Sequence, residues 1–439
     1  MEPLNHMKRP SLHHCASTTI NRRQFLKTTT AAGMAWMNPL AQQLARCAEN
    51  DVSETRGKAI ILLWMAGGPS QLETFDPHPS QNGSEGRKAI STPLKHLQLA
   101  QGLEEVAELM NDVSLIRSMV SQEGDHERAV YNVKTGYRPN PAIVHPSLGS
   151  IICHELPENA VEIPRHVSIL PNEWPARGGY LGATYDAFQI GDPGQRIPDV
   201  ISPVSKERLE QRLQGLDVVE RAFLKGRDPE WIASHTRHRA TIDEALKMMD
   251  SDQIKAFDVN LATATEVNAY GDTAFGRGCL AARRLIETGV RCVEVTLSGW
   301  DSHVNNHETQ SKRIATLAPA LAALIRDLKE RELLENTMVL CGGEFGRSPE
   351  LNPLEGRDHW PHGFSFLIGG GGIAGGKVIG ATDPEGIRKQ PENPVRVQDL
   401  HATIQHCLGI DSEKEIITPV GRPIFLSEGN VARELLVTS

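Results

Sequence analysis

The sequence predicts an α/β fold in which a mostly parallel sheet carries helices on both faces. Residues 58–66 and 113–119 form continuous apolar runs rather than alternating ones. Continuous apolarity indicates strands that are buried on both faces, as in a parallel sheet covered by helices. A helix predicted at residues 274–288, which Gly289 ends, precedes a further strand at 291–297. Strands that alternate with helices in this way are typical of doubly wound α/β proteins.

The remaining elements continue this alternation along the chain. A strand is predicted at 166–170, and residues 206–249, rich in charged side chains, Leu and Ala, predict two helices separated at 226–229. This pair is interpreted as a helical insertion near residues 204–250. The later elements are a helix at 308–334, strands at 337–341 and 364–368, and a helix at 397–408 that Gly409 ends. The main domain is therefore expected at 58–410, followed by a C-terminal tail at 411–439.

The composition is that of an ordinary globular protein. The 439 residues are 39% hydrophobic and 23% charged, and the absence of an 18-residue apolar run predicts no transmembrane span. The formal net charge of -9 argues against nucleic acid as the main partner. None of the seven cysteines forms a Cys-x-x-Cys pair, so a zinc knuckle or thioredoxin-like site is not predicted. Most of these thiols are expected to be small buried side chains.

The N-terminus resembles a twin-arginine export signal. Arg22 and Arg23 are followed directly by Gln-Phe-Leu-Lys and then by a mildly apolar stretch at residues 28–40. A charged region, a weak apolar region and an alanine-containing end near Ala48 are the parts of a signal peptide. The alternative is a basic surface turn before a first helix. We expect a signal peptide at residues 1–48 and a periplasmic or extracellular protein, exported in folded form.

Polar side chains gather after four of the predicted strands. In open α/β sheets, binding sites lie beyond the carboxyl ends of the strands, so these side chains are expected at one edge of the sheet. They are Ser70, Gln71, Glu73, Asp76 and His78 after the first strand, Glu123, Asp125, His126, Glu127 and Arg128 after the second, Asp301, His303 and His307 after the strand at 291–297, and Glu344, Arg347, Asp358, His359 and His362 after the strand at 337–341.

Carboxylates and imidazoles in such a set are the ligands of a divalent metal such as zinc, manganese or calcium. The candidate metal ligands read from these patterns are Asp301, His303, Asp358, His359 and His362. Arg128 and Arg347 are candidates to hold an anionic substrate through forked hydrogen bonds. Each of these residues alone also fits a surface or capping role; Asp76 fits a turn before Pro77, and Asp301 to His303 fits a turn.

Four motifs together resemble one family. They are Gly67-Gly68-Pro69-Ser70, Gly299-Trp300-Asp301-Ser302-His303, Gly343-Glu344-Phe345-Gly346-Arg347 and Gly356-Arg357-Asp358-His359. The sequence is identified by them as a member of the domain-of-unknown-function 1501 family, which is grouped with alkaline phosphatases and sulfatases. The resemblance extends over about residues 58–408. It implies an alkaline-phosphatase/sulfatase-like three-layer sandwich and metal-dependent hydrolysis of phosphate or sulfate esters.

Three segments are similar to sulfatases directly. In the first, residues 335–346, Glu344 takes the place of a metal-binding Asp, which implies that Glu344 is also a metal ligand. In the second, residues 397–409 correspond to a late structural helix. In the third, residues 126–136 correspond to the helix that begins with the sulfatase nucleophile, and Arg128 lies near the family's arginine. Here the nucleophile position falls on His126 instead of Cys, Ser or Thr, so His126 is a nucleophile, a general base, a metal ligand or an inert residue at a helix start.

Two functions follow from these observations. The first is an exported metal-dependent hydrolase that acts on a small-molecule or glycan ester of phosphate or sulfate. The alternative is a non-catalytic sulfatase-like envelope protein that binds a partner or glycan, because the usual nucleophile is missing. Nucleotide binding is not predicted: residues 371–377 fit the first part of a P-loop, but Val378 stands where a magnesium-binding hydroxyl is needed.

Overall fold

The computed structural model describes residues 57–79, 88–197, 200–227 and 238–437. All of these residues belong to the unit formed by residues 57–439. The predicted export signal at residues 1–48 lies outside the described residues, as do Cys15 and Cys47.

A nine-stranded sheet forms the centre of this unit, in the order β12-β4-β11-β8-β1-β7-β5-β6, with β13 also paired to β4. Its strands are β1 (Ala59–Ala66), β4 (Val113–Val120), β5 (His166–Ile169), β6 (Phe188–Ile190), β7 (Cys292–Ser298), β8 (Thr337–Gly342), β11 (Phe364–Gly369), β12 (Val378–Ile379) and β13 (Val395–Arg396). Every pairing is parallel except those of β11, which runs antiparallel to both β4 and β8. The predicted mostly parallel α/β sheet is therefore confirmed.

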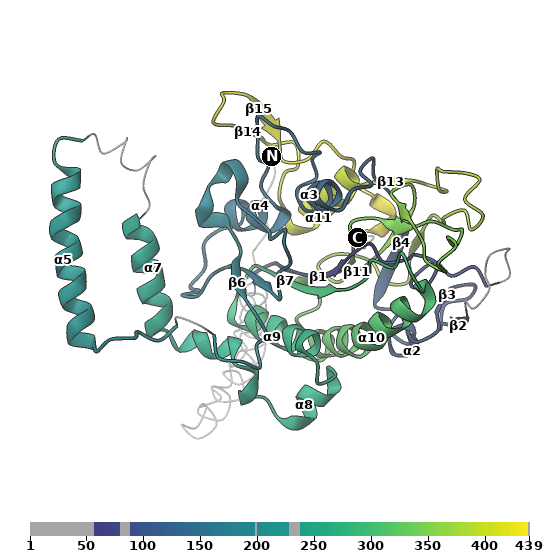
Figure 1. Ribbon diagram of the computed structural model, residues 1–439, viewed down its shortest axis with the longest axis horizontal. Helices are drawn as coiled ribbons and strands as arrows, with labels where there is room; N and C mark the ends of the chain where they lie inside the picture. The colour runs from purple at the N-terminus through teal and green to yellow at the C-terminus, as the bar shows by residue number, and fades with distance from the viewer. Residues whose placement is uncertain (1–56, 80–87, 198–199, 228–237, 438–439) are drawn as a thin grey trace, which may run out of the picture. The chain divides into compact units, whose positions relative to one another are not determined.

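Helices cover both faces of the sheet (Figure 1). The helices are α2 (Glu104–Ala107), α3 (His126–Thr135), α4 (Leu148–Glu155), α5 (Lys206–Leu224), α7 (His238–Asp250), α8 (Ala264–Ala269), α9 (Ala274–Thr288), α10 (Asn306–Glu330) and α11 (Val397–Leu408). Figure 1 shows α9 and α10 on one side of the central strands and α3, α4 and α11 on the other. The result is a three-layer sandwich.

Strand β1 shows why two separate cores form. Successive side chains of a strand point to opposite faces of the sheet. Ile61 and Leu63 accordingly pack in the core beneath α9 and α10, whereas Ile60 and Trp64 pack in the core beneath α3, α4 and α11. All four are almost completely buried, and burying each such side chain contributes about 1.5–3 kcal/mol. The continuous apolar run in the sequence is thus the consequence of a strand with two buried faces.

Shorter elements complete the described chain. They are β2 (Ala89–Ser91), β3 (Gln98–Ala100), β9 (Gly346–Arg347), β10 (His359–Trp360), β14 (Glu415–Ile417), β15 (Pro423–Phe425) and five 3-10 turns at Gly179–Leu181, Ala183–Tyr185, Asp252–Phe257, Val259–Leu261 and Arg433–Leu435. The C-terminal stretch returns to the main unit, because Leu426 and Leu435 are buried in the core beneath α3, α4 and α11. Helix α5 has no buried residue, whereas α7 reaches the opposite core through Met248.

Most predicted boundaries agree with the structure, and one helix differs. Helix α9 has the predicted bounds, with Gly289 as a left-handed cap. Helix α10 ends at Glu330 instead of continuing to residue 334, because the amides of Leu333 and Leu334 both turn back to the carbonyl of Leu328. This tight turn buries Leu333 and leads the chain directly into β8. Within the described part of the chain, no helix combines the length and apolarity needed to cross a membrane.

The cysteines of the described residues are all free, and four of the five are buried: Cys153, Cys279, Cys292 and Cys341. Burial raises the pKa of the Cys341 thiol well above its usual range, so this group stays protonated. The prediction of small buried thiols is therefore confirmed for these residues.

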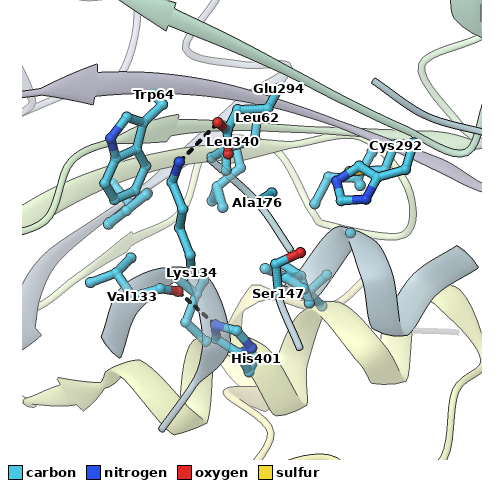
Figure 2. Close-up of a pocket in the computed structure, with 17 residues that line it drawn as sticks. Leu62, Trp64, Val133, Lys134, Ser147, Ala176, Cys292, Glu294, Leu340 and His401 are labelled. Atoms are coloured by element: carbon cyan, nitrogen blue, oxygen red, sulfur yellow. Dashed lines mark hydrogen bonds and ion pairs between the residues drawn. The ribbon is translucent and has the colours of Figure 1, made fainter. Parts of the chain in front are cut away.

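A buried ion pair lies between the sheet and the helices α3, α4 and α11 (Figure 2). The Lys134 ammonium of α3 donates to Glu294 of β7 at 2.9 Å and to the carbonyl of Trp174 at 3.0 Å, and it lies 5.1 Å from the ring centre of Trp64. Lys134 is 6% exposed and Glu294 is 2% exposed. The pair borders a cavity of about 30 Å³, which is large enough for a water molecule.

Candidate functional site

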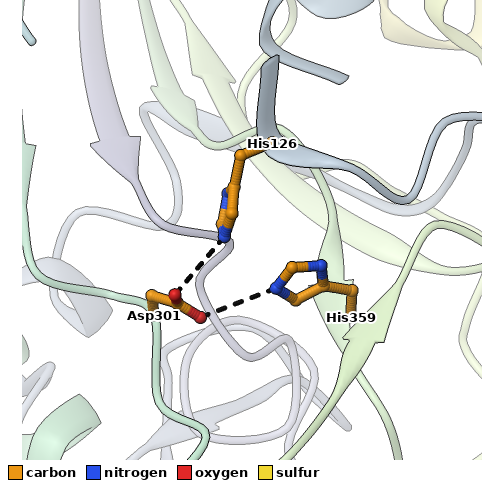
Figure 3. Close-up of side chains that lie close together, drawn as sticks. All are labelled: His126, Asp301 and His359. Atoms are coloured by element: carbon orange, nitrogen blue, oxygen red, sulfur yellow. Dashed lines mark ion pairs between the residues drawn. The ribbon is translucent and has the colours of Figure 1, made fainter. Parts of the chain in front are cut away.

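Three side chains from distant parts of the chain meet at the carboxyl edge of the sheet. His126 begins α3 after β4, Asp301 follows β7, and His359 begins β10. One ligand atom from each lies within 4.8 Å of the other two, which is the spacing expected of residues that share a metal ion. Figure 3 shows both imidazole rings pointing a nitrogen at the Asp301 carboxylate. This group is called the His126–Asp301–His359 centre below.

The ring of His359 is fixed by a backbone contact. Its Nδ1 donates to the carbonyl oxygen of Gly124 at 2.8 Å, so Nε2 is the ring nitrogen that faces the centre. This Nε2 lies 3.6 Å from Oδ1 of Asp301. Metal-binding histidines are commonly oriented in this way, with the second ring nitrogen held by a carbonyl or carboxylate.

His126 is held by a carboxylate in the same manner. Its Nδ1 lies 2.7 Å from Oε1 of Glu344, and its Nε2 lies 3.5 Å from Oδ2 of Asp301. Burial by itself lowers the pKa of His126, but hydrogen bonds and ion pairs with Asp301 and Glu344 outweigh it and raise the pKa to about 9. A bound cation would reverse this effect, because a positive charge beside the ring favours the neutral imidazole.

Asp301 is surrounded by positively charged or polar hydrogen donors. Burial raises the pKa of its carboxyl, but His126, His359 and Arg347 outweigh burial and hold the pKa well below its usual range. Oδ1 accepts a hydrogen bond from Nη2 of Arg347 at 2.6 Å and lies 3.2 Å from Nε2 of His303. Asp301 is therefore a carboxylate at any ordinary pH.

Glu344 follows β8, and its two carboxylate oxygens differ in their hydrogen bonds. Oε1 accepts a hydrogen bond from the amide of Gly67 at 2.9 Å in addition to its contact with His126. Oε2 is buried and has no hydrogen-bond partner among the described residues, and the same holds for Nε2 of His126. Buried polar atoms almost always have a partner, so these two atoms, one on Glu344 and one on the adjoining His126, fit a site for a cation.

His303 and Asp358 form an outer, more exposed part of the cluster. Nε2 of His303 lies 3.0 Å from Nε2 of His359, and Nδ1 of His303 lies 3.2 Å from Oδ1 of Asp358. The side chain of His303 is 45% exposed and that of Asp358 is 67% exposed. His303 thus borders the centre, whereas Asp358 contacts it through His303.

The guanidinium of Arg347 is directed at the protein itself. Its side chain is fully buried and donates to the carbonyls of Gly68 at 2.8 Å and Arg357 at 3.0 Å, to the carbonyl of Gly67, and to Asp301. All of its nitrogens are occupied, so these contacts do not support the predicted role in binding an anionic substrate. They hold Asp301 and the Gly67-Gly68 turn in place.

Two other predicted residues lie outside the centre. Arg128, exposed at the start of α3, forms a forked pair with Glu123 through Nε at 2.7 Å and Nη2 at 3.0 Å. His362, predicted as a metal ligand, lies instead in a neighbouring groove, where burial and then Lys389 lower the pKa of its ring. The physical reason is that β10 ends at Trp360, and the ring of His362 then packs edge-on against that of Trp360.

The turn after β1 makes the close packing of the centre possible. Gly67 has a φ of +117°, and a Cβ there would lie 2.4 Å from the amide nitrogen of Asp301. At Gly68, a Cβ would lie 2.4 Å from the ring of Phe345. Only glycine allows both approaches, which explains why the Gly-Gly motif and the Glu344-Phe345 motif occur in one sequence.

Sequence reasoning missed the aromatic walls of the centre. The ring of Phe345 lies 4.9 Å from that of His126 and 4.4 Å from that of His359. Trp174 stacks over His126 at 6.4 Å with an interplanar angle of 10°. Phe345 lies inside a motif that the sequence had singled out, but nothing in the sequence placed Trp174, which follows β5, near α3.

Glu73 and His307 belong to a separate buried cluster. Oε1 of Glu73 accepts from Nη2 of Arg357 at 3.0 Å and lies 3.1 Å from Nδ1 of His307, and Oε2 accepts from the Ser70 hydroxyl. Burial raises the pKa of Glu73, but His307, Arg357 and Ser70 outweigh it and lower the pKa to about 2. This cluster ties the turn after β1 to the loop that carries Asp358 and His359.

Asp76 is likewise structural. Its Oδ2 accepts from the amide of Thr382 at 2.8 Å and from the Thr382 hydroxyl at 2.7 Å, so Asp76 fastens the loop after β12. The sequence had left open a cap of the turn before Pro77 for Asp76, whereas these two hydrogen bonds join it to a residue that is distant in sequence.

Comparisons with known proteins give one family. The family model described as "Protein of unknown function (DUF1501)" matches residues 57–436. A search of curated proteins finds no match.

Solved structures are similar to this chain only at a distance. The PsFucS1 sulfatase from Pseudoalteromonas sp. is 12% identical, with a TM-score of 0.39 over 84% of this chain and 71% of that chain. The C-terminal periplasmic domain of EcEptC from Escherichia coli, in complex with Zn, is 10% identical, with a TM-score of 0.38 over 87% of this chain and 92% of that chain. TAB5 alkaline phosphatase with Mg bound is 13% identical, with a TM-score of 0.35 over 81% of this chain and 99% of that chain. At these scores, the likeness assigns no activity to this chain.

Proposed function

This chain belongs to the DUF1501 family, and from that premise we propose that it is an exported, metal-dependent hydrolase of phosphate or sulfate esters. The observation that carries the proposal is the His126–Asp301–His359 centre, whose ligand atoms lie within 4.8 Å of one another. Beside it, a buried oxygen of Glu344 has no hydrogen-bond partner among the residues that the structure describes.

The proposed metal ligands are Nε2 of His126, a carboxylate oxygen of Asp301 and Nε2 of His359. Two imidazoles and a carboxylate favour zinc or manganese, whereas calcium prefers a set of oxygen ligands. A divalent ion held there supplies Lewis-acid polarisation of a phosphoryl or sulfuryl oxygen, or lowers the pKa of a bound water. Glu344 and the Gly124 carbonyl orient the two rings, because each occupies the Nδ1 nitrogen.

Two arginines have different roles in this proposal. Arg347 positions Asp301, since each of its three side-chain nitrogens already donates to a partner within the protein. Arg128 lies two residues after His126, and its Nη1 has no hydrogen-bond partner among the described residues. This free donor is proposed to bind the charged group of the ester, because a guanidinium matches the geometry of phosphate and sulfate oxygens.

Export is proposed from the N-terminal residues alone. The Arg22-Arg23 pair and the apolar stretch that follows it resemble a twin-arginine signal, which exports folded proteins to the periplasm or beyond. A site that binds its metal before export fits such a route.

Metal content is the experiment that tests the centre. Elemental analysis of the purified protein is expected to find close to one zinc or manganese per chain, and Asp301→Asn and His359→Ala are expected to lose it. His362→Ala is the matched control, because His362 lies three residues from His359 but outside the centre. Metal retained in both centre variants would place the ion elsewhere.

Turnover tests the activity. The metal-loaded protein is expected to hydrolyse aryl phosphate or aryl sulfate, and His126→Ala and Asp301→Asn are expected to reduce kcat/KM at least about 100-fold, as removal of a catalytic metal ligand does. Protein with a full metal complement and no turnover on either substrate class would contradict the hydrolase.

The second candidate is a non-catalytic sulfatase-like envelope protein that binds a partner or glycan. It is favoured by one observation: His126 stands where relatives of this kind carry a hydroxyl or thiol nucleophile, and its ring is held between Glu344 and Asp301. Bound metal without turnover, together with binding of a sulfated glycan, would favour this candidate.

A further inference from the structure

A groove of about 550 Å³ adjoins the centre and is rich in positive charge. It is lined by the ends of β4, α3 and β13, by the residues after β10 and by the start of α11. Four of its side chains are basic, namely Arg138, His362, Lys389 and Arg396, and Asp399 is the one acidic side chain in the lining. A positive groove in a chain with a net charge of -9 is a local feature that the overall composition does not explain.

Two of these cations are held in place by neighbouring acceptors. Arg138 donates through Nε to Glu123 at 2.6 Å and through Nη1 to Gln122 at 2.9 Å. Arg396 donates to Asp399 through Nε at 3.0 Å and through Nη2 at 2.6 Å. In the part of the chain that the structure describes, Nη2 of Arg138 and Nη1 of Arg396 have no partner, so each guanidinium keeps a free donor.

Lys389 supplies a charge that no acid balances. Its side chain is exposed, and no ion pair joins its ammonium to any described residue. His362 lies close enough for Lys389 to influence its ring. With one unpaired ammonium and two guanidinium groups that keep a free donor, the groove has the chemistry of a site for a sulfate, phosphate or carboxylate group.

The groove and the centre lie at the same edge of the sheet. Strands β1, β7, β8, β4 and β13 run in one direction, and their carboxyl ends carry both sites. The segment from His359 to His362 joins them directly, since His359 is part of the centre and His362 lines the groove. Three residues of chain span at most about 10 Å, so the backbone positions of His359 and His362 are close together.

We propose that this groove binds a second anionic group of the substrate, so that the preferred substrate is a polyanion with a further charged group beside the ester held at the centre. This inference rests on the proposed function for the place of the ester. Sulfated and phosphorylated substrates with several charged groups both carry the second anion that the proposal requires. A simple monoester lacks this anion, so the basic side chains of the groove would not contact it.

The test is calorimetric binding of matched, non-hydrolysable ligands to the full chain. A disaccharide with two sulfonate groups is compared with the same disaccharide carrying one sulfonate group. A third ligand is the same disaccharide with two phosphonate groups, called the bisphosphonate below. Because the C–S and C–P bonds are not cleaved, binding is measured without turnover. We expect the disulfonate to bind about tenfold more tightly than the monosulfonate, since each charge-assisted hydrogen bond contributes that order of affinity.

Variants assign this preference to the groove. Lys389→Gln and Arg138→Gln are expected to reduce the ratio of the two affinities to below about threefold. Lys95→Gln is the matched control, because Lys95 is an exposed lysine that does not line the groove, and the ratio is expected to stay unchanged. The ratio is also expected to fall at high salt, as it does for exposed charges.

Each outcome decides the inference. A ratio near one in the wild-type protein, a ratio that Lys389→Gln and Arg138→Gln leave intact, or no binding of either ligand overturns it. If the protein hydrolyses no ester but still binds the disulfonate more tightly than the monosulfonate through the groove, the proposed hydrolase activity is wrong and the groove remains a polyanion-binding site. Tighter binding of the bisphosphonate than of the disulfonate would identify phosphate as the preferred group, and the reverse order would identify sulfate.

Discussion

At the scale of single residues, Glu344 joins three parts of the candidate site. It accepts from the Gly67 amide after β1 and holds Nδ1 of His126 at the start of α3, and its buried Oε2 has no hydrogen-bond partner within the described part of the chain. A glutamine at this position would keep the shape of the side chain but would remove the negative charge beside the centre. Glu344 therefore offers a test of whether this carboxylate serves a bound cation.

We expect Glu344→Gln to weaken metal binding about 10- to 100-fold, because it removes the charge that orients His126. Competition with a chelator of known affinity measures this change. Glu350→Gln is the control, since Glu350 is exposed and, within the described residues, its carbonyl rather than its carboxylate accepts a hydrogen bond, from Ser348. Equal metal affinity in Glu344→Gln and the wild-type protein would contradict a role in cation binding.

The Lys134–Glu294 pair is the second residue whose surroundings give a clear expectation. Both side chains are buried, and Lys134 also holds the carbonyl of Trp174, whose ring stacks on His126. Lys134→Met leaves Glu294 as an uncompensated buried charge, so the free energy of unfolding is expected to fall by about 3–5 kcal/mol. Chemical denaturation measures this loss.

A double variant distinguishes the effect of the unpaired Glu294 charge from the effect of lost packing around Lys134. Lys134→Met combined with Glu294→Leu is expected to recover most of the lost stability, because well-packed apolar residues replace buried ion pairs at little cost. A double variant as unstable as Lys134→Met alone would show that the ammonium acts through Trp174 rather than through Glu294.

At the scale of elements, prediction succeeded where local chemistry decides a boundary. Gly289 and Gly409 adopt left-handed conformations and end α9 and α11 where the sequence placed their ends. Helix α10 was predicted to run too far, because the apolar Leu333 and Leu334 look helical in sequence although they form a turn. Strand β11 was expected, but its antiparallel direction was not, since direction depends on partners from distant parts of the chain.

The helical layer of α3, α4 and α11 contains two histidines that stay neutral. Burial lowers the pKa of His145 to about 4, and burial, only partly offset by a hydrogen bond to the Val133 carbonyl, lowers that of His401 to about 4. In the unfolded chain both rings take up protons near their ordinary pKa of 6.5. Because the unfolded state then binds more protons, the free energy of unfolding falls as the pH drops below about 6.5.

We expect each of these histidines to lower stability by about 1–2 kcal/mol between pH 6.5 and pH 5, before the carboxyl groups of the unfolded chain titrate. Denaturant unfolding at several pH values measures the slope. In His401→Gln, the free energy of unfolding is expected to depend less steeply on pH between pH 5 and pH 6.5, because one of the two histidines no longer contributes. An unchanged slope would mean that the ring of His401 takes up its proton without unfolding.

At the scale of the whole molecule, the sequence predicted where the site lies but did not predict all of the residues that form it. Reading polar residues after strands brought His126, Asp301, Glu344 and His359 to one place, and the structure places these four together. It could not separate His359 from His362, because a short strand ends between them: His359 belongs to the centre, whereas His362 lines the groove. Trp174 was out of reach, because only the fold brings the loop after β5 to the start of α3.

The export proposal also concerns the molecule as a whole and has its own test. Arg22→Lys combined with Arg23→Lys keeps the positive charge of the N-terminal segment but removes the paired guanidinium groups. If the twin-arginine route recognises this pair, the double variant is expected to accumulate in the cytoplasm with its N-terminus uncleaved. Fractionation and N-terminal sequencing measure this, and unchanged export would exclude the route.

The position of β1 has a consequence for how the protein is made. This central strand comes first in the described chain, yet its two neighbours are β7 and β8, with Ile60 opposite Cys292 and Ala59 opposite Thr337. Until β7 at residues 292–298 leaves the ribosome, this apolar strand has no native partner, and until β8 at residues 337–342 follows, one of its edges stays open. Such edges promote aggregation. Nascent chains that stop before residue 337 are therefore expected to need a chaperone and to be digested rapidly by protease. The sheet closes only when synthesis is nearly complete.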